Sequence, residues 1–398
     1  MAHSTSHLEL EMTSEGRAQI EVSKLETYRS SNKEYVPSKA PVFYNPLMKT
    51  NRDIAVAFLR TIGSISERKV VVGDPLAGVG VRSVRFLLET EVTDRAFSND
   101  LNKRAFELIR RNAKLNRVGR RLHASCNDAN VFLAEHSEPG ERFSYVDIDP
   151  FGSPAPFLDN AVMSLIHGGY LAVTATDSPV LCGLFPNKMR LMYDSYCRKL
   201  PCKKEIGVRV LIGAVVRAAA RHEIGADPLI CYAERNYFRA YFRLHRSRSK
   251  ALSAVGSIGY VASRDGDEGW EAMSCYDLAE LNAGIRPKKA VYGPMWTSAY
   301  EDSLFASRLA EGGAGVSPES DALIGKVRAE ESDILGYYPH DLLAKACGGR
   351  ALPIVEILNR IRKAGIRAGR TLFDPSAVKA QASFKEVTDA LSTGPAIP

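Results

Sequence analysis

KVVVGDPLAGVGVRSVRFLL, residues 69–88, predicts a β-strand, a glycine turn and an α-helix in succession. The run Lys69–Gly73 is apolar enough for a strand that is buried on both faces. Gly78 and Gly80 then allow a tight turn, and apolar side chains recur at helical spacing from Val84 onward. The segment therefore predicts one β-α unit of an α/β fold.

The same pattern recurs along the first part of the chain. Runs that predict further strands lie at residues 96–98, 122–126, 143–148 and 170–174. Strands that alternate with helices form a mostly parallel sheet covered on both faces. The prediction is a Rossmann-like, doubly wound α/β domain, and ligands of such domains lie beyond the carboxyl ends of the strands.

Length and composition indicate a globular protein with two domains. The chain has 398 residues, of which 45% are hydrophobic and 25% are charged, and chains of this length usually form more than one core. Lysine and arginine together number 53 against 46 aspartates and glutamates, which gives a formal net charge of +7. This charge suits a polyanionic partner, although many proteins with such a charge bind none.

The sequence carries no sign of export or of a membrane segment. Its seven cysteines include no C-x-x-C pair, and the N-terminus carries Glu9 and Glu11 in place of an apolar signal segment. The most apolar stretch, residues 210–220, is broken by Arg217 and falls short of the roughly 20 residues that cross a bilayer. We expect a cytoplasmic protein with reduced thiols, and nothing implies an obligate protein partner.

The glycine turn suits a nucleotide-like cofactor. Gly78 and Gly80 let the backbone approach a ligand closely, and the next helix presents its positive N-terminus. Asp74 stands where a carboxylate can pair with the amino group of a methionine moiety, and Ser83 replaces the third glycine of a dinucleotide fingerprint. The pattern favours S-adenosylmethionine over NAD, and a tight turn without a ligand is the alternative.

Acidic residues also follow the next two predicted strands. Asp100 lies at the distance where an acid accepts hydrogen bonds from ribose hydroxyls. Asp128 and Ala129 follow the third strand, where a carboxylate and neighbouring backbone groups can hold the amino group and ring edge of adenine. Because Asn-Asp is also a common helix cap, a purely structural role for Asp128 is the alternative.

The most unusual segment, DIDPFGSPAPF at residues 147–157, follows the fourth strand. Asp149 and the carbonyl of Pro150 are placed to accept both N–H groups of an exocyclic amine, which would orient its lone pair towards a methyl donor. Phe151 offers a flat face for a base taken out of its stack. A proline-rich structural turn is the alternative.

The order of residues in this segment bears on the substrate. Many amino methyltransferases carry Asp/Asn-Pro-Pro-Tyr/Phe, whereas the aromatic residue of the segment 149–152 comes one place earlier. Methylation of DNA adenine is therefore disfavoured. The segments 174–179 and 181–183 follow the fifth predicted strand on the same edge of the sheet, and we expect them to shape the base pocket.

Taken together, these segments resemble the family of tRNA (guanine-N2) dimethyltransferases that modify position 26. The likeness extends over about three quarters of the chain, and the DPFGSP run is its most specific part. The matching segments are FYNP at 43–46, NRD at 51–53, GVGVR at 78–82, ND at 99–100, DPFGSP at 149–154, TATD at 174–177, LCG at 181–183 and YGPMW at 292–296.

The resemblance implies S-adenosylmethionine as the cofactor and the residues that hold it. Arg52 and Arg82 would contact its methionine end, Asp100 its ribose, and Asp128 with Ala129 its adenine. Without the resemblance, the position of Arg52 in the first turn of a helix fits a solvated surface arginine equally well.

The resemblance also implies the catalytic groups. Asp149 would be the catalytic carboxylate, and Phe43 and Phe151 would flank the guanine. Some relatives carry cysteine clusters that look metal-binding, but Cys197 and Cys202 are separated by four residues and no second pair follows. No metal is predicted.

The predicted methyltransferase domain, with its N-terminal extension, spans residues 1–245, and residues 246–398 form a smaller α+β domain that binds tRNA. The run 239–250 mixes aromatic and basic residues, which suits RNA, although an edge strand with solvent-facing arginines has the same pattern. An amphipathic helix at 352–363, a basic turn and a strand suggest a winged-helix-like piece. Its expected phosphate contacts are Arg360, Arg362, Lys363, Arg367 and Arg370.

The expected activity is methyl transfer from S-adenosylmethionine to N2 of guanine 26 in tRNA, giving N2-methylguanosine and then N2,N2-dimethylguanosine. Three alternatives stay open. They are an amino methyltransferase that acts on another base or a protein amide, a non-catalytic RNA-binding protein, and an NAD-dependent dehydrogenase. Acids at three successive strand ends disfavour the second, and Ser83 disfavours the third.

Overall fold

The predicted strands are present in one mixed sheet of seven strands. Their bounds are Val70–Asp74 (β3), Thr93–Asn99 (β4), Leu122–Ser125 (β5), Phe143–Ile148 (β6), Leu165–Ala175 (β7), Ile224–Glu234 (β8) and Tyr237–Arg246 (β9). The strand order is β5-β4-β3-β6-β7-β9-β8. Strand β3 pairs in parallel with β4 and β6, and β4 with β5, whereas β8 and β9 are antiparallel. The predicted α/β fold class is confirmed.

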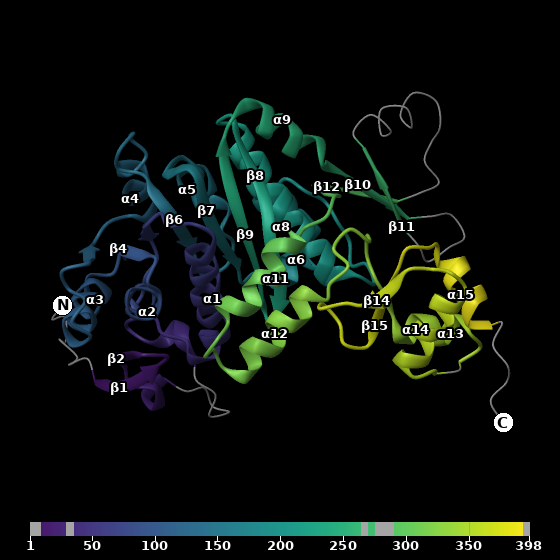
Figure 1. Ribbon diagram of the computed structural model, residues 1–398, viewed down its shortest axis with the longest axis horizontal. Helices are drawn as coiled ribbons and strands as arrows, with labels where there is room; N and C mark the ends of the chain where they lie inside the picture. The colour runs from purple at the N-terminus through teal and green to yellow at the C-terminus, as the bar shows by residue number, and fades with distance from the viewer. Residues whose placement is uncertain (1–8, 29–35, 264–269, 275–289, 350, 393–398) are drawn as a thin grey trace, which may run out of the picture. The chain divides into compact units, whose positions relative to one another are not determined.

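The computed structural model (Figure 1) describes residues 9–28, 36–263, 270–274, 290–349 and 351–392. The chain forms two compact units, and each is built from several stretches of sequence. The first unit comprises residues 1–149, 159–172 and 307–324, and the second comprises 150–158, 173–306 and 325–398. These units are not consecutive halves, so they do not coincide with the predicted division at residue 245, and the assignment of tRNA binding to residues 246–398 stays a prediction.

The helices of the first unit place their apolar faces on its strands. Phe58 and Phe86 both pack on Tyr145 of β6, with ring centroids 6.1 and 5.7 Å apart, and all three side chains are buried. This contact fixes two helices beside the strand that leads to the DPFG segment. The main helices of the unit are α1 (Lys49–Ile65), α2 (Val81–Glu89), α3 (Lys103–Leu115) and α4 (Ala129–Glu135).

An N-terminal hairpin joins this unit through buried charges. Its strands β1 (Leu10–Glu15) and β2 (Ala18–Ser23) are antiparallel. Arg85 of α2 contacts three carboxylates, with N–O distances of 2.9 Å to Glu15, 2.7 Å to Asp53 and 2.8 Å to Glu89. Burial alone would raise the pKa of Asp53, but its contacts with Lys49 and Arg85 hold the pKa at about 2. The network therefore fastens β1 and α1 to α2.

Replacing Arg85 by methionine should lower the free energy of unfolding by about 3 kcal/mol, because it leaves buried carboxylates without their shared cation. Urea unfolding measures the effect. The matched control is Arg95→Met, since Arg95 is half exposed and, among the described residues, pairs with the equally exposed Asp94 alone. It should cost less than about 0.5 kcal/mol. If the two variants lose the same free energy of unfolding, the buried network contributes no more than an exposed ion pair and this interpretation is wrong.

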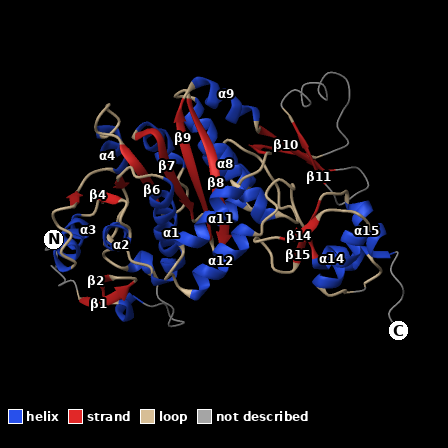
Figure 2. Ribbon diagram, viewed as in Figure 1, coloured by secondary structure: helices blue, strands red, loops and turns tan. Residues whose placement is uncertain are grey.

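In the second unit, β8 and β9 pack against the long helix α8 (Lys203–Ala220), as Figure 2 shows. The sheet order places β9 between β7 and β8. Arg239 of β9 is fully buried and donates a hydrogen bond of 2.7 Å to the hydroxyl of Thr174. The sequence suggested that this arginine contacts RNA or faces solvent on an edge strand. Both predictions are wrong for Arg239, because it is buried and β9 is an interior strand. The run 239–250 includes an interior strand.

The end of the chain forms the predicted helix, turn and strand. Figure 1 shows α13, α14 and α15 gathered about β14 and β15. The predicted helix at 352–363 is present as α14 and begins after Pro353. The bounds are Tyr338–Pro339 (β13), His340–Ala346 (α13), Ile354–Lys363 (α14), Ala368–Arg370 (β14), Ala377–Ala380 (β15) and Phe384–Ser392 (α15), and the sheet order is β13-β15-β14.

A buried charge cluster ties this C-terminal part to α8 within the second unit. The ammonium of Lys379 on β15 lies 3.1 Å from Glu205 of α8 and 2.9 Å from Glu330. Glu205 also pairs with Arg209 at 2.8 Å, and all these side chains are buried. The remaining elements are α5 (Leu158–Met163), α6 (Ser178–Leu181), α7 (Pro186–Tyr193), α9 (Arg248–Gly256), β10 (Ile258–Ser263), β11 (Trp270–Met273), β12 (Val291–Trp296), α11 (Ser303–Gly312) and α12 (Pro318–Arg328).

Candidate active site

The glycine turn joins β3 to α2 and has a backbone shape that requires glycine. Gly78 and Gly80 have φ angles of +54° and +77°, and Gly80 caps the N-terminus of α2. A Cβ atom on Gly78 would lie 2.7 Å from the carbonyl oxygen of Phe43. The backbone N–H of Gly78 donates a hydrogen bond of 2.9 Å to the carboxylate of Asp100. The structure therefore brings together two of the predicted cofactor contacts, on neighbouring strand ends.

Asp74 lies at the end of β3 and is buried. It accepts a hydrogen bond of 3.0 Å from the hydroxyl of Ser83. Burial is the main cause that raises the pKa of Asp74 to about 7; the carboxylates of Asp147 and Asp149 add to the rise, while Arg82 and Ser83 oppose it. A cation such as the ammonium of an amino acid moiety would favour the ionised form of this carboxyl.

Arg82 in the first turn of α2 joins the ends of α1 and β6. Its guanidinium lies 3.3 Å from the carboxylate of Asp147, donates a hydrogen bond of 2.9 Å to the side chain of Asn51, and forms a short ion pair with Asp149. Arg82 is buried, whereas the side chain of Asp149 is 18% exposed. Asp149 is thus an acceptor at the surface of the site, held by a cation beneath it.

Sequence analysis did not single out Asp147. The spacing of the two aspartates could have indicated it. Residues two apart in a strand point to the same face, so Asp147 and Asp149 are expected on one side of the strand. Their joint contact with Arg82 could be expected only if α2 was known to lie over that face.

The DPFG turn is fixed by the segment that follows β7. The N–H of Gly152 donates to the hydroxyl of Thr176 at 2.6 Å, and the N–H of Thr176 donates to the carbonyl of Gly152 at 2.9 Å. Pro150 is buried and the ring of Phe151 is 64% exposed, so the turn presents an aromatic face to solvent. Phe43 is half-buried in the first unit, and its role beside the guanine stays a prediction.

Arg52 is buried in an ion pair that sequence analysis did not foresee. Its Nε and Nη2 atoms lie 2.6 and 2.5 Å from the two carboxylate oxygens of Glu15, and Nη2 also donates to the carbonyl of Asn45 at 3.0 Å. The alternative of a solvated arginine is wrong. Because Glu15 already balances its charge, Arg52 supports the hairpin and α1, and its contact with the methionine end of the cofactor stays a prediction.

Asp128 has the capping role that the sequence left open. One of its carboxylate oxygens accepts the N–H groups of Asn130 and Val131 at 2.8 and 3.2 Å at the start of α4. The loop before it is held by Asn99, whose side chain bonds both backbone groups of Asn127. Ala129 is buried. The contact of Asp128 and Ala129 with adenine stays a prediction.

Asp100, like Asp128, is held by backbone N–H groups that donate to its carboxylate. Its two oxygens accept the N–H groups of Gly78 and Asn102, both at 2.9 Å, and burial raises its pKa. A carboxylate oxygen has more than one lone-pair site, so these bonds orient Asp100 and leave it able to accept from a ribose hydroxyl.

Three of the five predicted phosphate contacts near the C-terminus have partners within the chain. Arg360 is buried and pairs with Glu356, Arg362 donates to the carbonyl of Ala368, and Arg367 pairs with Glu331 and Asp333. The predicted phosphate contact of Arg360 is wrong, because a guanidinium that is buried and paired within the protein does not reach a phosphate. Lys363 and Arg370 are exposed.

The pKa of Asp74 gives a test of the site. The ordinary pKa of an aspartate is 3.8, and that of Asp74 in the folded protein is about 7. Because the folded protein keeps the proton more tightly than the unfolded chain, the free energy of unfolding falls as the pH rises from the first value to the second. Between about pH 5 and about pH 8, the free energy of unfolding should therefore fall less for Asp74→Asn than for the parent protein. Urea unfolding at several pH values measures the difference, with Asp94→Asn as the exposed control. Parallel pH profiles for all three proteins would refute the assignment.

The described ranges of the chain contain no group of three or more His, Cys, Asp or Glu side chains that could hold a metal ion. Cys197 and Cys202 are buried. None of the helices in those ranges is long and apolar enough to cross a membrane.

The parallel strands, the glycine turn and the acidic residues after successive strand ends define a methyltransferase domain of the Rossmann-like class. The chain belongs to the N2,N2-dimethylguanosine tRNA methyltransferase family, whose model matches residues 16–392.

Individual relatives agree with the family assignment. The chain is 32% identical to the tRNA (guanine(26)-N(2))-dimethyltransferase of Thermococcus kodakarensis over 96% of its own length and 99% of the relative's. It is also 32% identical to the tRNA (guanine(26)-N(2)/guanine(27)-N(2))-dimethyltransferase of Aquifex aeolicus, over 95% of each chain. The structure of Trm1 from Pyrococcus horikoshii with S-adenosyl-L-methionine superposes with a TM-score of 0.83 at 28% identity, covering 96% of this chain and 99% of that one.

Proposed function

We propose that the protein transfers methyl groups from S-adenosylmethionine to the exocyclic N2 of guanine 26 in tRNA, giving N2-methylguanosine and then N2,N2-dimethylguanosine. The observation that carries this proposal is the partly exposed carboxylate of Asp149, which follows β6 and pairs with Arg82, in a chain of this family. Relatives that share about a third of its residues over nearly their whole length are named for this reaction.

The chemical difficulty is the weak nucleophile. The lone pair of an exocyclic amine is delocalised into the ring, so the enzyme must orient it and favour the positive charge that develops on nitrogen. Asp149 and the carbonyl of Pro150 accept the two N–H groups. Arg82 pairs with Asp149 and holds its carboxylate in position to accept them. Asp149 then accepts the proton that the nitrogen loses, or passes it to solvent.

The cofactor would lie beyond β3, β4 and β5. When bound, S-adenosylmethionine supplies an electrophilic methyl group on a sulfonium. Asp74, Arg52 and Arg82 would contact the methionine end, and the backbone at Gly78 and Gly80 would lie against it. Asp100 would accept from the ribose, and Asp128 with Ala129 would hold the adenine. The polar groups at these strand ends fit this set of contacts, because a carboxylate with fixed hydrogen-bond partners lies at or just after the end of each of three neighbouring strands.

The guanine would lie between two aromatic rings. Phe151 is exposed at the DPFG turn, as a ring that receives an unstacked base must be. Phe43 would cover the other face. Residues 246–398 would hold the tRNA, and we place the reaction in the cytoplasm, without an obligate protein partner.

Asp149→Ala should lower the rate of methyl transfer by about 10²-fold or more, because it removes the group that orients the amine. Affinity for S-adenosylmethionine should stay within about threefold of the parent, since Asp149 acts on the acceptor. The rate is measured with unmodified tRNA and labelled cofactor, followed by nucleoside analysis, and the affinity by calorimetry. Loss of cofactor binding would show that Asp149 belongs to the cofactor site.

Replacing guanine 26 of the transcript by adenine separates the proposal from its alternatives. The parent protein should then transfer no methyl group to the transcript. Continued methylation would assign another acceptor in the same tRNA, and equal activity on a DNA oligonucleotide would favour an amino methyltransferase of broader range.

A further inference from the structure

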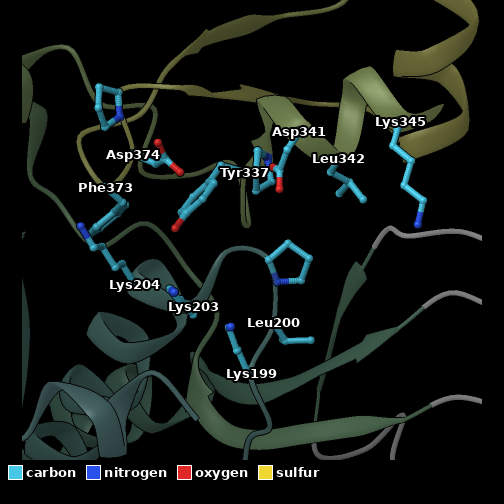
Figure 3. A pocket seen from close by; sticks show the side chains of 13 residues that line it. Lys199, Leu200, Lys203, Lys204, Tyr337, Asp341, Leu342, Lys345, Phe373 and Asp374 are labelled. Carbon is cyan, nitrogen blue, oxygen red and sulfur yellow. The ribbon is translucent and has the colours of Figure 1, made fainter. Parts of the chain in front are cut away.

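A second pocket, of about 730 Å³, lies entirely within the second unit and shares no lining residue with the candidate active site. Figure 3 shows Lys199, Lys203 and Lys204 on one side of it, and Asp341 and Lys345 of α13 on another. This volume exceeds that of a single small anion and is typical of sites for extended ligands.

The side chains that line this pocket carry more positive than negative charge. Its lining contains four lysines, at 199, 203, 204 and 345, and two aspartates. Asp374 is engaged in its own turn, where it accepts from the N–H and hydroxyl of Ser376 at 2.9 and 2.7 Å. Across residues with described positions, no carboxylate lies within 4.0 Å of any of the four ammonium groups. The lysines are therefore available to an external anion.

The position of two of these lysines in α8 adds to the positive field. Lys203 and Lys204 are the first residues of this helix, where the helix dipole is already positive and cations are unfavourable. The acid in the same turn, Glu205, gives no compensation at the pocket, because it is buried and pairs with Arg209 and Lys379. Two lysines thus stand where helix stability alone favours acidic residues.

The aromatic residues of the lining indicate which part of a nucleic acid fits. Tyr337 and Phe373 stack on each other with ring centroids 6.3 Å apart, and they are only 2% and 1% exposed. They therefore offer no open face for a base. Flexible lysine side chains act as point charges and bind phosphate without recognising base edges.

We propose that this lysine pocket, formed by Lys199, Lys203, Lys204 and Lys345, binds backbone phosphates of the tRNA. The inference rests on the proposed function for the identity of the RNA. It assigns contacts with the tRNA to the segment before α8, to the first turn of α8 and to α13, none of which was predicted from the sequence to bind RNA phosphates.

The test is the double variant Lys203→Glu/Lys204→Glu in the full chain. Its affinity for unmodified tRNA should fall at least about tenfold at about 0.1 M salt, and the dependence of binding on salt should become shallower, because fewer counterions are released. Fluorescence anisotropy measures both. The melting temperature should not fall, since glutamate is favoured at a helix N-terminus, and affinity for S-adenosylmethionine should not change.

The matched control is Lys69→Glu/Lys385→Glu. It changes the net charge by the same amount at two exposed lysines outside the pocket, and it should weaken tRNA binding far less. If the two double variants bind tRNA equally well, the lysine pocket is not a tRNA site. The inference is also overturned if inorganic phosphate raises the melting temperature of the parent and not of the pocket variant while tRNA affinity is unaffected, since the pocket would then hold a small anion.

Methylation of the same transcript by the parent protein is measured in parallel. If the parent methylates guanine 26 and the pocket variant binds tRNA like the control, the inference fails and the proposed function stands. If the parent forms no methylated guanosine and the variant still loses tRNA affinity relative to the control, the proposed function fails and the lysine pocket stands as an RNA site.

Discussion

The site depends on one guanidinium that offsets three carboxylates. Asp74 ends β3, and Asp147 and Asp149 lie at the end of β6, which pairs in parallel with β3. Parallel pairing brings these acids to one edge of the sheet, where burial and the charges of Asp147 and Asp149 raise the pKa of Asp74. Arg82 contacts Asp147 and Asp149 directly and opposes the rise in the pKa of Asp74. The position of the Asp149 carboxylate therefore depends on the first turn of α2, which carries Arg82.

The rest of the first unit holds that turn. Arg82 and Arg85 lie in the same helix, and Arg85 is fixed by carboxylates from the hairpin, α1 and α2 itself. The glycine turn that begins α2 is in turn held by Asp100 at the end of the next strand. Through Glu15, the N-terminal hairpin thus contributes to the position of α2 and hence of the Asp149 carboxylate. A buried ion network of this kind adds little net stability, and its main effect is to allow a single arrangement of the helices.

Most of the fold and the location of the site could be predicted from sequence, because both follow from short-range patterns. The periodicity of the strands and the glycine turn predicted where the strands end. Asp100 and Asp149 were chosen as candidate site residues because they follow two of those ends. Roles that depend on distant partners could not be predicted. Arg52 is buried because Glu15, 37 residues earlier, folds over it, and nothing near Arg52 in the sequence reports that contact. Arg239 shows the same limit: the alternating basic pattern is identical for an edge strand and an interior strand, and only the order of the strands distinguishes them.

The two kinds of cation in this protein suit two separate tasks. A group that fixes the geometry of reacting atoms must be rigid, and the planar guanidinium of Arg82, with several donors in fixed directions, holds two carboxylates and an amide at once. A surface that receives many tRNAs must tolerate different sequences, and flexible lysines provide charge without demanding one geometry. An enzyme that methylates a guanine of tRNA needs both properties. Hence the arginine of the site is buried and paired, while the cations of the lysine pocket have no carboxylate partner within the described chain.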